Sequence, residues 1–328
     1  MSYGFFQKEL FTQNVDVMRS TFKLDYNSMH AIGAFLYTVA GRLADRENLE
    51  KNLKILKSRY GIFSEFRAHL TIPMVVKMSL AEDPEVYMEG VSAAYSALSR
   101  DFMLGDESRL LAAMILYENA RMEDLDRICA HTMEVYRGMK ENHPWLTGQP
   151  DLPFAVLMGL QDEETERQLL TAEECYGIVE ERFPISKDSV QTVSHILAIG
   201  KGSAEEKSEN FLQMYDTFRE CGLRLSGDSM PILAVLVNSG LSAGEAAAQT
   251  KENDEFLKGQ KGFGMLGTGG DLRRMFAAAI TSVNMIPEDP AVFGALSGTV
   301  LAVILAIEIA IMISVISATS HASSSSSK

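Results

Sequence analysis

The sequence predicts an all-α protein built from stacked helical hairpins of about 40 residues, and three observations lead to this fold class. A turn of small and polar residues, followed by an apolar segment, recurs along most of the chain. The apolar segments follow one another at nearly constant spacing. We find no sustained alternation of apolar and polar residues, which is the pattern of a half-buried strand.

The recurring turn is clearest at residues 223–238. Leu225 precedes a small polar stretch that contains Asp228 and Ser229, and an apolar helix is predicted over 232–237. Asp and Ser can cap a helix by accepting hydrogen bonds from its first free amides, and the apolar residue before the cap can pack back on the helix. We therefore expect Asp228 and Ser229 to act as caps. Further copies of the turn lie at residues 24–28, 63–65, 104–108, 146–151, 185–189 and 266–271.

The spacing of the apolar segments is the second observation. The segments can be anchored at Phe35, Val75, Met114, Ala155, His195, Ala234 and Phe276, and the steps between anchors are 40, 39, 41, 40, 39 and 42 residues. This period is close to that of HEAT and armadillo repeats. One hairpin cannot cover its own apolar face, so stacked neighbours bury a continuous core. The arrangement predicted first is an open α-solenoid, and the alternative is a closed α/α toroid.

The elements follow in order. An N-terminal helix is predicted at 3–21, and the first repeat at 27–60 combines an apolar inner helix, 29–43, with an amphipathic outer helix, 47–60. Later inner helices are predicted at 75–80, 112–117, 154–160, 193–199, 232–237 and 272–283. Later outer helices are predicted at 85–100, 122–140, 172–183 and 204–221. Acidic connectors lead from inner to outer helices, where the helix dipole favours negative charge.

Four regions result from this pattern. Residues 1–26 form an N-terminal helix, and residues 27–286 form the repeat domain. Residues 291–317 form an apolar helix with one charge, Glu308, that is long enough to span a bilayer or could instead close the end of the helical array. Residues 318–328 are mostly serine, and we expect them to be disordered.

Charge and cysteine content exclude several classes of function. The formal net charge is −14, which argues against a nucleic-acid partner because such proteins carry basic patches. Three cysteines, an odd number without a CxxC pair, indicate reduced thiols. The N-terminus lacks the pattern of a secretory signal. We expect a cytoplasmic protein, with a tether to the cytoplasmic membrane through 291–317 as an alternative.

Four segments resemble a known family when taken together. They are GIFSEFR at 61–67, ENHPWLT at 141–147, SHILAIG at 194–200 and QKGFGMLG at 260–267. In combination they are similar to landmarks of domain of unknown function family 4003, a group of bacterial proteins mostly from Firmicutes. The resemblance covers nearly the full chain and implies no activity, ligand or catalytic residue. Family members end in an alanine- and serine-rich stretch, whereas the end of this sequence is more aliphatic.

A glycine-rich turn is the only locally basic point of this acidic chain. Gly262, Gly264 and Gly267 fit the GxGxxG pattern, but a dinucleotide site needs a preceding strand, which the sequence does not predict. The turn can instead be a flexible lead into the helix at 272–283. A third interpretation is an anion or acidic-partner site. Its members would be Lys261, Gly262, Gly264, Gly267, Arg273 and Arg274, together with the amides that begin the helix.

No catalytic, cofactor-binding or metal-ligating residue is predicted. The six histidines form no HExxH pair, and His195 lies in an apolar inner helix as a core residue. His143 precedes Pro144 and Trp145, and we interpret it as part of a packing cluster in a loop. Neighbouring glutamates, such as those at 163–164, point in different directions on a helix and do not form an acid–base pair.

The sequence favours a non-catalytic scaffold that binds an unknown protein or peptide partner. The rival is an enzyme with a central cavity in a closed toroid, which a contact between the first hairpin and the seventh inner helix would favour. The third hypothesis is an adaptor tethered to the membrane through 291–317. The oligomeric state is not predicted.

Overall fold

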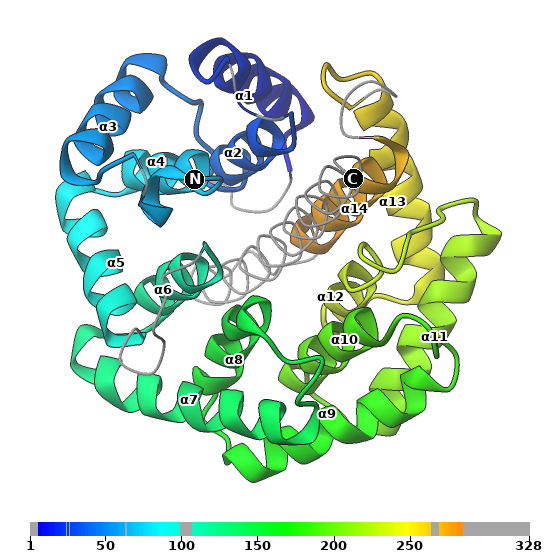
Figure 1. Cartoon of the computed structure of the whole chain (residues 1–328). Coiled ribbons are helices and arrows are strands. Elements are labelled where there is room, and N and C mark those ends of the chain that lie inside the picture. Colours follow the sequence, from blue (N-terminus) through cyan, green and yellow to red (C-terminus); the bar gives the residue numbers. More distant parts are fainter. Residues whose placement is uncertain are drawn as a thin grey trace, which may run out of the picture.

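The computed structural model describes residues 6–23, 25, 27–62, 64–98, 107–263 and 269–284. Within these residues the secondary structure consists of helices without a strand, so the predicted all-α class is confirmed. Figure 1 shows the helices in two concentric layers around a common centre. The apolar helix predicted at 291–317 and the serine-rich tail lie outside the described residues.

The outer layer contains the odd-numbered helices (Figure 1). They are α1 (Lys8–Thr21), α3 (Arg46–Arg59), α5 (Pro84–Leu98), α7 (Leu125–Asn142), α9 (Thr165–Glu180), α11 (Ala204–Glu220) and α13 (Ala243–Lys258). The inner layer contains the even-numbered helices. They are α2 (Asn27–Val39), α4 (Thr71–Leu80), α6 (Glu107–Asn119), α8 (Leu152–Gly159), α10 (Lys187–Ile199), α12 (Ile232–Asn238) and α14 (Gly269–Asn284). The loops of the described residues contain the short 3₁₀ segments η1 (Glu65–Arg67), η3 (Met122–Asp124) and η4 (Gln149–Asp151).

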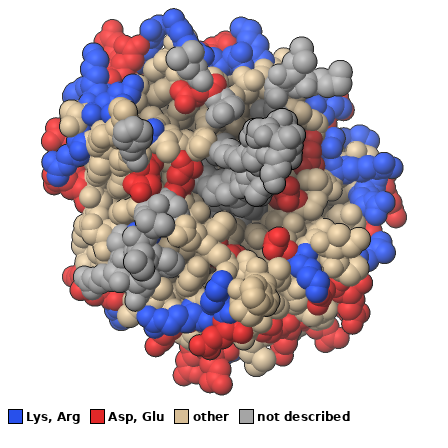
Figure 2. All heavy atoms as spheres, viewed as in Figure 1, with Lys and Arg blue, Asp and Glu red and all other residues tan. Residues whose placement is uncertain are grey.

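The division into apolar inner and amphipathic outer helices follows from burial. Every residue of the inner helix α8 is buried, because α6, α7 and α10 pack around it. The outer helix α3 buries only Leu49, Asn52 and Leu56, which lie on one face at spacings of three and four residues. Acidic and basic side chains cover the outer rim of the molecule, as Figure 2 shows.

The hairpin register differs from the predicted one. Of its two inner neighbours along the chain, each outer helix packs more on the one that follows it, so the hairpins run from outer to inner rather than from inner to outer. The N-terminal helix α1 is the first outer helix, and it buries Phe11, Val15 and Met18. Its pattern alone does not reveal this role, because its partner α2 is apolar on most sides and could pack on either neighbour. We call the loops within hairpins turns and the loops between hairpins connectors.

The first hairpin contacts the last one and closes the layers into a ring. The backbone amide of Phe6 donates to Oδ1 of Asn284 at 2.7 Å, and Lys8 Nζ lies 2.6 Å from Glu252 Oε1. The ring of Phe11 lies 6.3 Å from that of Phe256, between centroids. The alternative arrangement, a closed α/α toroid, therefore describes the helices better than an open solenoid.

The predicted caps of the inner helices are not formed by the expected side chains. Residue Pro231 is the N-cap of α12, without a side-chain hydrogen bond, and Ser186 before α10 also makes none. Hydroxyl Oγ of Ser229 instead donates at 2.6 Å to Oδ2 of Asp271, which lies at the beginning of α14 in the next hairpin. The expectation of a local cap was wrong here because the turn binds its neighbour rather than its own helix. The apolar residue before the 185–189 turn, Ile185, is 96% exposed and does not pack back.

Candidate functional site

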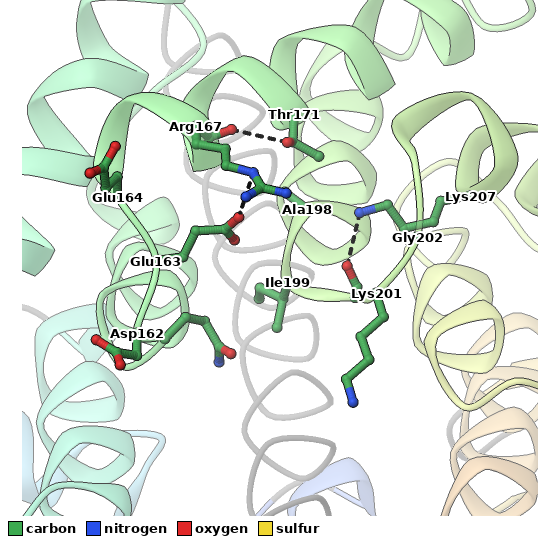
Figure 3. Close-up of a pocket in the computed structure, with 12 residues that line it drawn as sticks. Asp162, Glu163, Glu164, Arg167, Thr171, Ala198, Ile199, Lys201, Gly202 and Lys207 are labelled. Carbon is green, nitrogen blue, oxygen red and sulfur yellow. Dashed lines mark hydrogen bonds and ion pairs between the residues drawn. The ribbon is translucent and has the colours of Figure 1, made fainter.

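A cavity of about 760 Å³ lies between two successive connectors, one joining α8 to α9 and the other joining α10 to α11. We call it the connector pocket (Figure 3). Its lining comes from residues 161–164, the first half of α9, the end of α10 and the beginning of α11. Because α9 and α11 are neighbours in the outer layer, two adjacent hairpins supply the opposite walls.

One wall of the pocket is cationic. It carries Lys201 in the connector and Lys207 in the first turns of α11. The side chain of Lys201 is exposed, and within the described part of the chain it has no ion-pair partner. The local backbone is fixed by Gly202, whose φ of 101° only glycine adopts easily, and by Ser203, which accepts from the Glu206 amide as the N-cap of α11.

Lys207 is an unusual lysine because it is only 4% exposed. Figure 3 shows its ammonium group directed across the pocket wall, and its Nζ donates to the carbonyl oxygen of Gly200 at 2.9 Å. The described residues provide it with no carboxylate partner within ion-pair distance. Burial lowers the pKa of Lys207 from 10.5, while Cys175 and Glu163 act in the opposite direction.

The opposite wall is acidic and carries one cation. Arg167 Nε lies 3.0 Å from Glu163 Oε1, and Figure 3 shows these two side chains pointing toward each other. The neighbouring Asp162 and Glu164 point to the other side of their connector and are exposed. The Glu163–Arg167 pair lies one helical turn apart and is solvent-exposed, so it contributes little to stability and can open.

The arrangement suits a ligand that carries an acidic group. Lys201 and Lys207 present two ammonium groups that no carboxylate of the described chain neutralises. Asp162 and Glu164 belong to the acidic wall, but their carboxylates point away from the pocket, so a basic group of the ligand would meet them only at its edge. This site is not recognisable in the sequence, because its members come from two connectors 40 residues apart and the sequence shows only that the connectors are acidic.

The glycine-rich turn predicted as an anion site lies elsewhere, at the closure of the ring. Lys261 Nζ is 3.4 Å from Asp16 Oδ1 of α1. Gly262 has a φ of 90°, and a Cβ added there would lie 2.7 Å from Nη1 of Arg19. Gly264 and Gly267 lie outside the described residues. The structure thus places Lys261 beside a carboxylate of the same chain.

The two arginines of that predicted site lie in the first half of α14. Arg273 Nε is 2.7 Å from Asp254 Oδ1, and both side chains are almost buried. The Nε of Arg274 is buried without a hydrogen-bond partner. Asp271 occupies the first turn of the same helix and adds negative charge at its beginning. The geometry therefore brings Lys261 and Arg273 to carboxylates of the chain itself, and binding of an external anion there stays a prediction.

The histidines occupy structural positions. His195 is 2% exposed in α10, and burial followed by the charge of His143 lowers its pKa to about 3. Its Nδ1 lies 3.9 Å from Asp151 Oδ1 and makes no hydrogen bond. The ring of His143 packs against that of Tyr176 at a tilt of 43°, with centroids 4.3 Å apart, and its Nε2 lies 3.1 Å from Glu173 Oε2. The packing interpretation of His143 agrees with these contacts.

Asp151 is the second perturbed group of this region. Burial raises its pKa from 3.8 to about 6, although the Gly148 amide donates to it at 2.8 Å. The cysteines Cys129 and Cys175 are buried and Cys221 is exposed, and none of these three forms a disulfide. Among the described residues, no three His, Cys, Asp or Glu side chains are grouped so that they could hold a metal ion.

Comparison with known proteins identifies the family. The family model described as a protein of unknown function (DUF4003) matches residues 14–315, nearly the whole chain. The chain belongs to this family. The resemblance seen in the sequence is therefore confirmed, and the family's description assigns no activity to its members.

One relative of this family member comes from Bacillus subtilis (strain 168), where it is named uncharacterized protein YeaA. The two chains are 24% identical over 222 residues, which is 65% of this chain and 66% of the relative. The chain thus spans just under two thirds of that relative's length. No solved structure matches the chain. In the part of the family member that the structure describes, none of the helices has the length and apolar character needed to span a bilayer.

Proposed function

We propose that the chain is a non-catalytic binding protein whose connector pocket holds an acidic group of a protein or peptide partner. The observation that carries this proposal is the pair of ammonium groups, Lys201 and Lys207, that line one pocket and have no carboxylate partner among the described residues. Charge-assisted contacts from such groups to a carboxylate are among the stronger polar interactions of proteins.

The surrounding charges limit which acidic partner fits. The formal net charge of the chain is −14, and Asp162 and Glu164 lie at the pocket, so a polyacidic segment is repelled at longer range. A segment that combines one acidic residue with a nearby basic residue satisfies both walls. The volume of about 760 Å³ is in the range of ordinary ligand pockets and admits a few residues of a peptide.

The ring supports this function by fixing the two walls relative to each other. The connectors are short, and each is held between an inner helix whose residues are mostly buried and an outer helix that packs on its neighbour. Gly200 approaches α12 closely, since a Cβ there would lie 2.0 Å from Oδ1 of Asn238, which itself donates to the Ile196 carbonyl at 2.6 Å. A preorganised site of this kind loses little conformational entropy on binding.

Selection from a library of short random peptides tests the proposal. We expect the wild-type chain to enrich peptides with an acidic and a basic residue close together. The Lys201→Glu variant should bind the enriched peptides at least about tenfold more weakly, since tenfold corresponds to about 1.4 kcal/mol and facing like charges cost several kcal/mol. Binding should also weaken with added salt, because part of the contact is exposed.

The matched control is Lys251→Glu. Lys251 is an exposed lysine of α13 that lies away from the connector pocket, so this variant has the same net charge as Lys201→Glu. It should bind the peptides like the wild type. Equal weakening by both variants, or no enrichment over Lys201→Glu, would contradict the connector pocket as the binding site.

The closed ring favours a second candidate, an enzyme whose site is enclosed by the helices. The observation is the contact of the first hairpin with the last, at Phe6 and Asn284. Incubation of the protein with a metabolite extract, followed by mass spectrometry against a heat-denatured sample, tests it. Consumption of a metabolite by the native sample alone would support the enzyme, and identical profiles would contradict it.

The membrane-tether hypothesis concerns residues 291–317. Fractionation of cells that express the chain with and without residues 291–328 tests it. We expect a tethered chain to sediment with membranes only when these residues are present. Recovery of the full chain without detergent would remove the hypothesis.

A further inference from the structure

We propose that the ring docks on a lipid bilayer through the edge formed by its turns, with Trp145 and Ile185 as the side chains that enter the membrane interface. We call this edge the turn edge. The connector pocket lies at the other ends of the helices, between two connectors. This inference therefore does not depend on the peptide partner proposed above, and either can fail without the other.

Trp145 and Ile185 are the most exposed large apolar side chains of the described residues, each 96% exposed. They occupy equivalent positions of successive repeats, 40 residues apart, and each directly follows a proline, Pro144 or Pro184. Proline fixes its own φ, so the backbone that presents each side chain is stiff. Single exposed apolar residues are common on protein surfaces, but two at the same position of the repeat indicate a shared surface.

The two turns that carry these side chains are neighbours on the ring (Figure 1). Gln191 of α10 donates from Nε2 to Oγ1 of Thr147 at 2.7 Å, which joins α10 to the turn that holds Trp145. The turn between α11 and α12 continues the row, because a Cβ added at Gly227 would lie 3.3 Å from Oγ of Ser186. Successive turns therefore line one edge of the ring and present their exposed side chains there.

The charges of the turns and of the connectors differ. In the described part of the chain the turns carry five acidic and five basic residues, whereas the connectors carry eight acidic and three basic residues. The helix α9, which separates the two edges, has 16 residues and is about 24 Å long, or roughly three Debye lengths at physiological ionic strength. The acidic connectors are thus screened from a bilayer at the turn edge.

The kind of exposed side chain favours a bilayer over a protein surface. Tryptophan combines an apolar ring with a polar N–H group and is enriched at membrane–water interfaces, where both are satisfied. A third apolar side chain, Ile62, is 69% exposed in the separate turn between α3 and α4. A bilayer accepts such separate side chains at any spacing, whereas a protein partner needs a matching pocket for each of them.

The other exposed large apolar side chains do not form a comparable surface. Among the described residues they are 53 to 59% exposed, and none of them belongs to a turn. Two of them, Leu43 and Met122, lie in connectors, where acidic residues outnumber basic ones. The turn edge is therefore the part of the described surface that combines the most exposed apolar side chains with balanced charge.

The fluorescence of Trp145 tests the inference directly, because it is the single tryptophan of the chain. The purified full chain is titrated at physiological salt with vesicles of phosphatidylcholine and phosphatidylglycerol. We expect a blue shift of the emission and quenching by lipids brominated in their acyl chains, since the indole ring leaves water. An emission spectrum that vesicles leave unchanged would overturn the inference.

The variant Ile185→Ser keeps the tryptophan and removes the second inserted side chain. It should weaken vesicle binding, measured from the same titration, about tenfold, because burial of a side chain of this size contributes an effect of that order. The matched control is Leu170→Ser, since Leu170 is 59% exposed on α9 and lies outside the turns. The control should bind like the wild type, and equal binding by Ile185→Ser and the control would overturn the inference.

Flotation with vesicles separates the turn edge from other ways to reach a membrane. We expect the double variant of Trp145→Ser and Ile185→Ser to stay unbound, with the melting temperature of the wild type because both side chains lie in solvent. Flotation of the double variant at the wild-type level would assign the attachment to another segment and overturn the inference. A blue shift that grows with protein concentration without vesicles would also overturn it, because a second copy of the chain would then cover the turn edge.

Discussion

The turns that enter the inner helices and the connectors that enter the outer helices differ in where their polar side chains bind. In connectors the contacts are local, as in the Asp45 carboxylate that accepts from the Glu47 amide at 3.1 Å and the Ser242 hydroxyl that caps α13. In several turns they reach the next hairpin, as in the His69 amide that donates to Glu107 at 2.9 Å, although the Asp151 carboxylate accepts from Gly148 of its own turn. Connectors thus begin helices, whereas turns join hairpins.

The difference follows from geometry. A connector is short and leads directly into an outer helix whose first amides face solvent, so a nearby oxygen is their natural partner. A turn lies against the beginning of the next inner helix, as the contacts of His69 with Glu107 and of Ser229 with Asp271 show. Buried polar groups need partners wherever these are found, and in the ring the nearest ones belong to the neighbour.

The largest effect is expected at Asp151, a buried turn carboxylate. Its pKa of about 6 lies above the value near 4 of an unfolded chain, so between these pH values the native state keeps a proton that the unfolded state has released. Stability contributed by this group therefore falls as the pH rises through that window. Asp151→Asn removes the buried charge and should stabilise the protein by about 3 kcal/mol at pH 7.

Denaturant unfolding at pH 3.5 and pH 7 measures this effect. At pH 3.5 the native carboxyl is protonated, and the variant should differ little from the wild type. The amide oxygen of the variant can still accept from Gly148, and His195, whose lowered pKa gives an opposite slope, is present in both proteins. An equal difference at both pH values would show that the charge of Asp151 is not the cause.

The second prediction breaks the contact between one turn and the inner helix of the next hairpin. Asp271 accepts from the Ser226 amide at 2.8 Å and from the hydroxyls of Ser226 and Ser229 at 2.6 Å each. Asp271→Ala leaves these donors without their acceptor, and we expect a loss of about 2 to 3 kcal/mol, since single hydrogen bonds to charged groups contribute about 1.5 to 3. A loss in the range of an ordinary surface substitution would argue against turns as joints between hairpins.

The third prediction removes a connector cap. The Ser242 hydroxyl accepts from the Glu245 amide, and the Glu245 carboxylate accepts in return from the Ser242 backbone, as in a capping box. Ser242→Ala should cost about 1 kcal/mol of unfolding free energy, with Ser242→Thr close to the wild type. If Ser242→Ala cost more unfolding free energy than Asp271→Ala, the connector contact would stabilise the protein more than the turn contact, contrary to this prediction.

The smallest effect is expected at Asp228, which the sequence suggested as a cap. The N-cap of α12 is Pro231, and no amide at the beginning of this helix binds an Asp228 oxygen. Asp228→Ala should therefore change the unfolding free energy by no more than about 0.5 kcal/mol. A loss of about 1 kcal/mol of unfolding free energy, measured by thermal or denaturant unfolding, would support the hypothesis that Asp228 caps α12.

Much of the fold could be predicted because period and burial are linked in a helical repeat. The inner helix predicted at 193–199 lies within α10, and the segment at 232–237 lies within α12. The register of the hairpins could not be predicted, since α2 is apolar on most sides and offers no distinction between its two neighbours. The helix predicted from residue 172 begins earlier, at Thr165. Its first turns are polar and line the connector pocket, so they lack the apolar pattern by which the helix was predicted.

The site was less accessible to sequence reasoning. Lys201 and Lys207 lie on the two sides of the N-cap of α11. Nothing in their sequence spacing distinguishes the buried lysine from the exposed one. The glycine-rich turn attracted attention through its composition, but Lys261 and Arg273 lie beside carboxylates that are distant in sequence. Composition identifies charge, whereas only packing shows whether the charge is already neutralised.

Closure of the ring also affects how the chain is made. The amide of Phe6 binds a side chain 278 residues later, so on a ribosome that adds about 5 to 20 residues per second this partner emerges roughly 14 to 56 s afterwards. During that interval the face of α1 that carries Phe11 lacks the aromatic rings of Phe256 and Phe263. The earliest hairpin to be synthesised is thus the last to be completed, and it is where a nascent-chain chaperone would be needed longest.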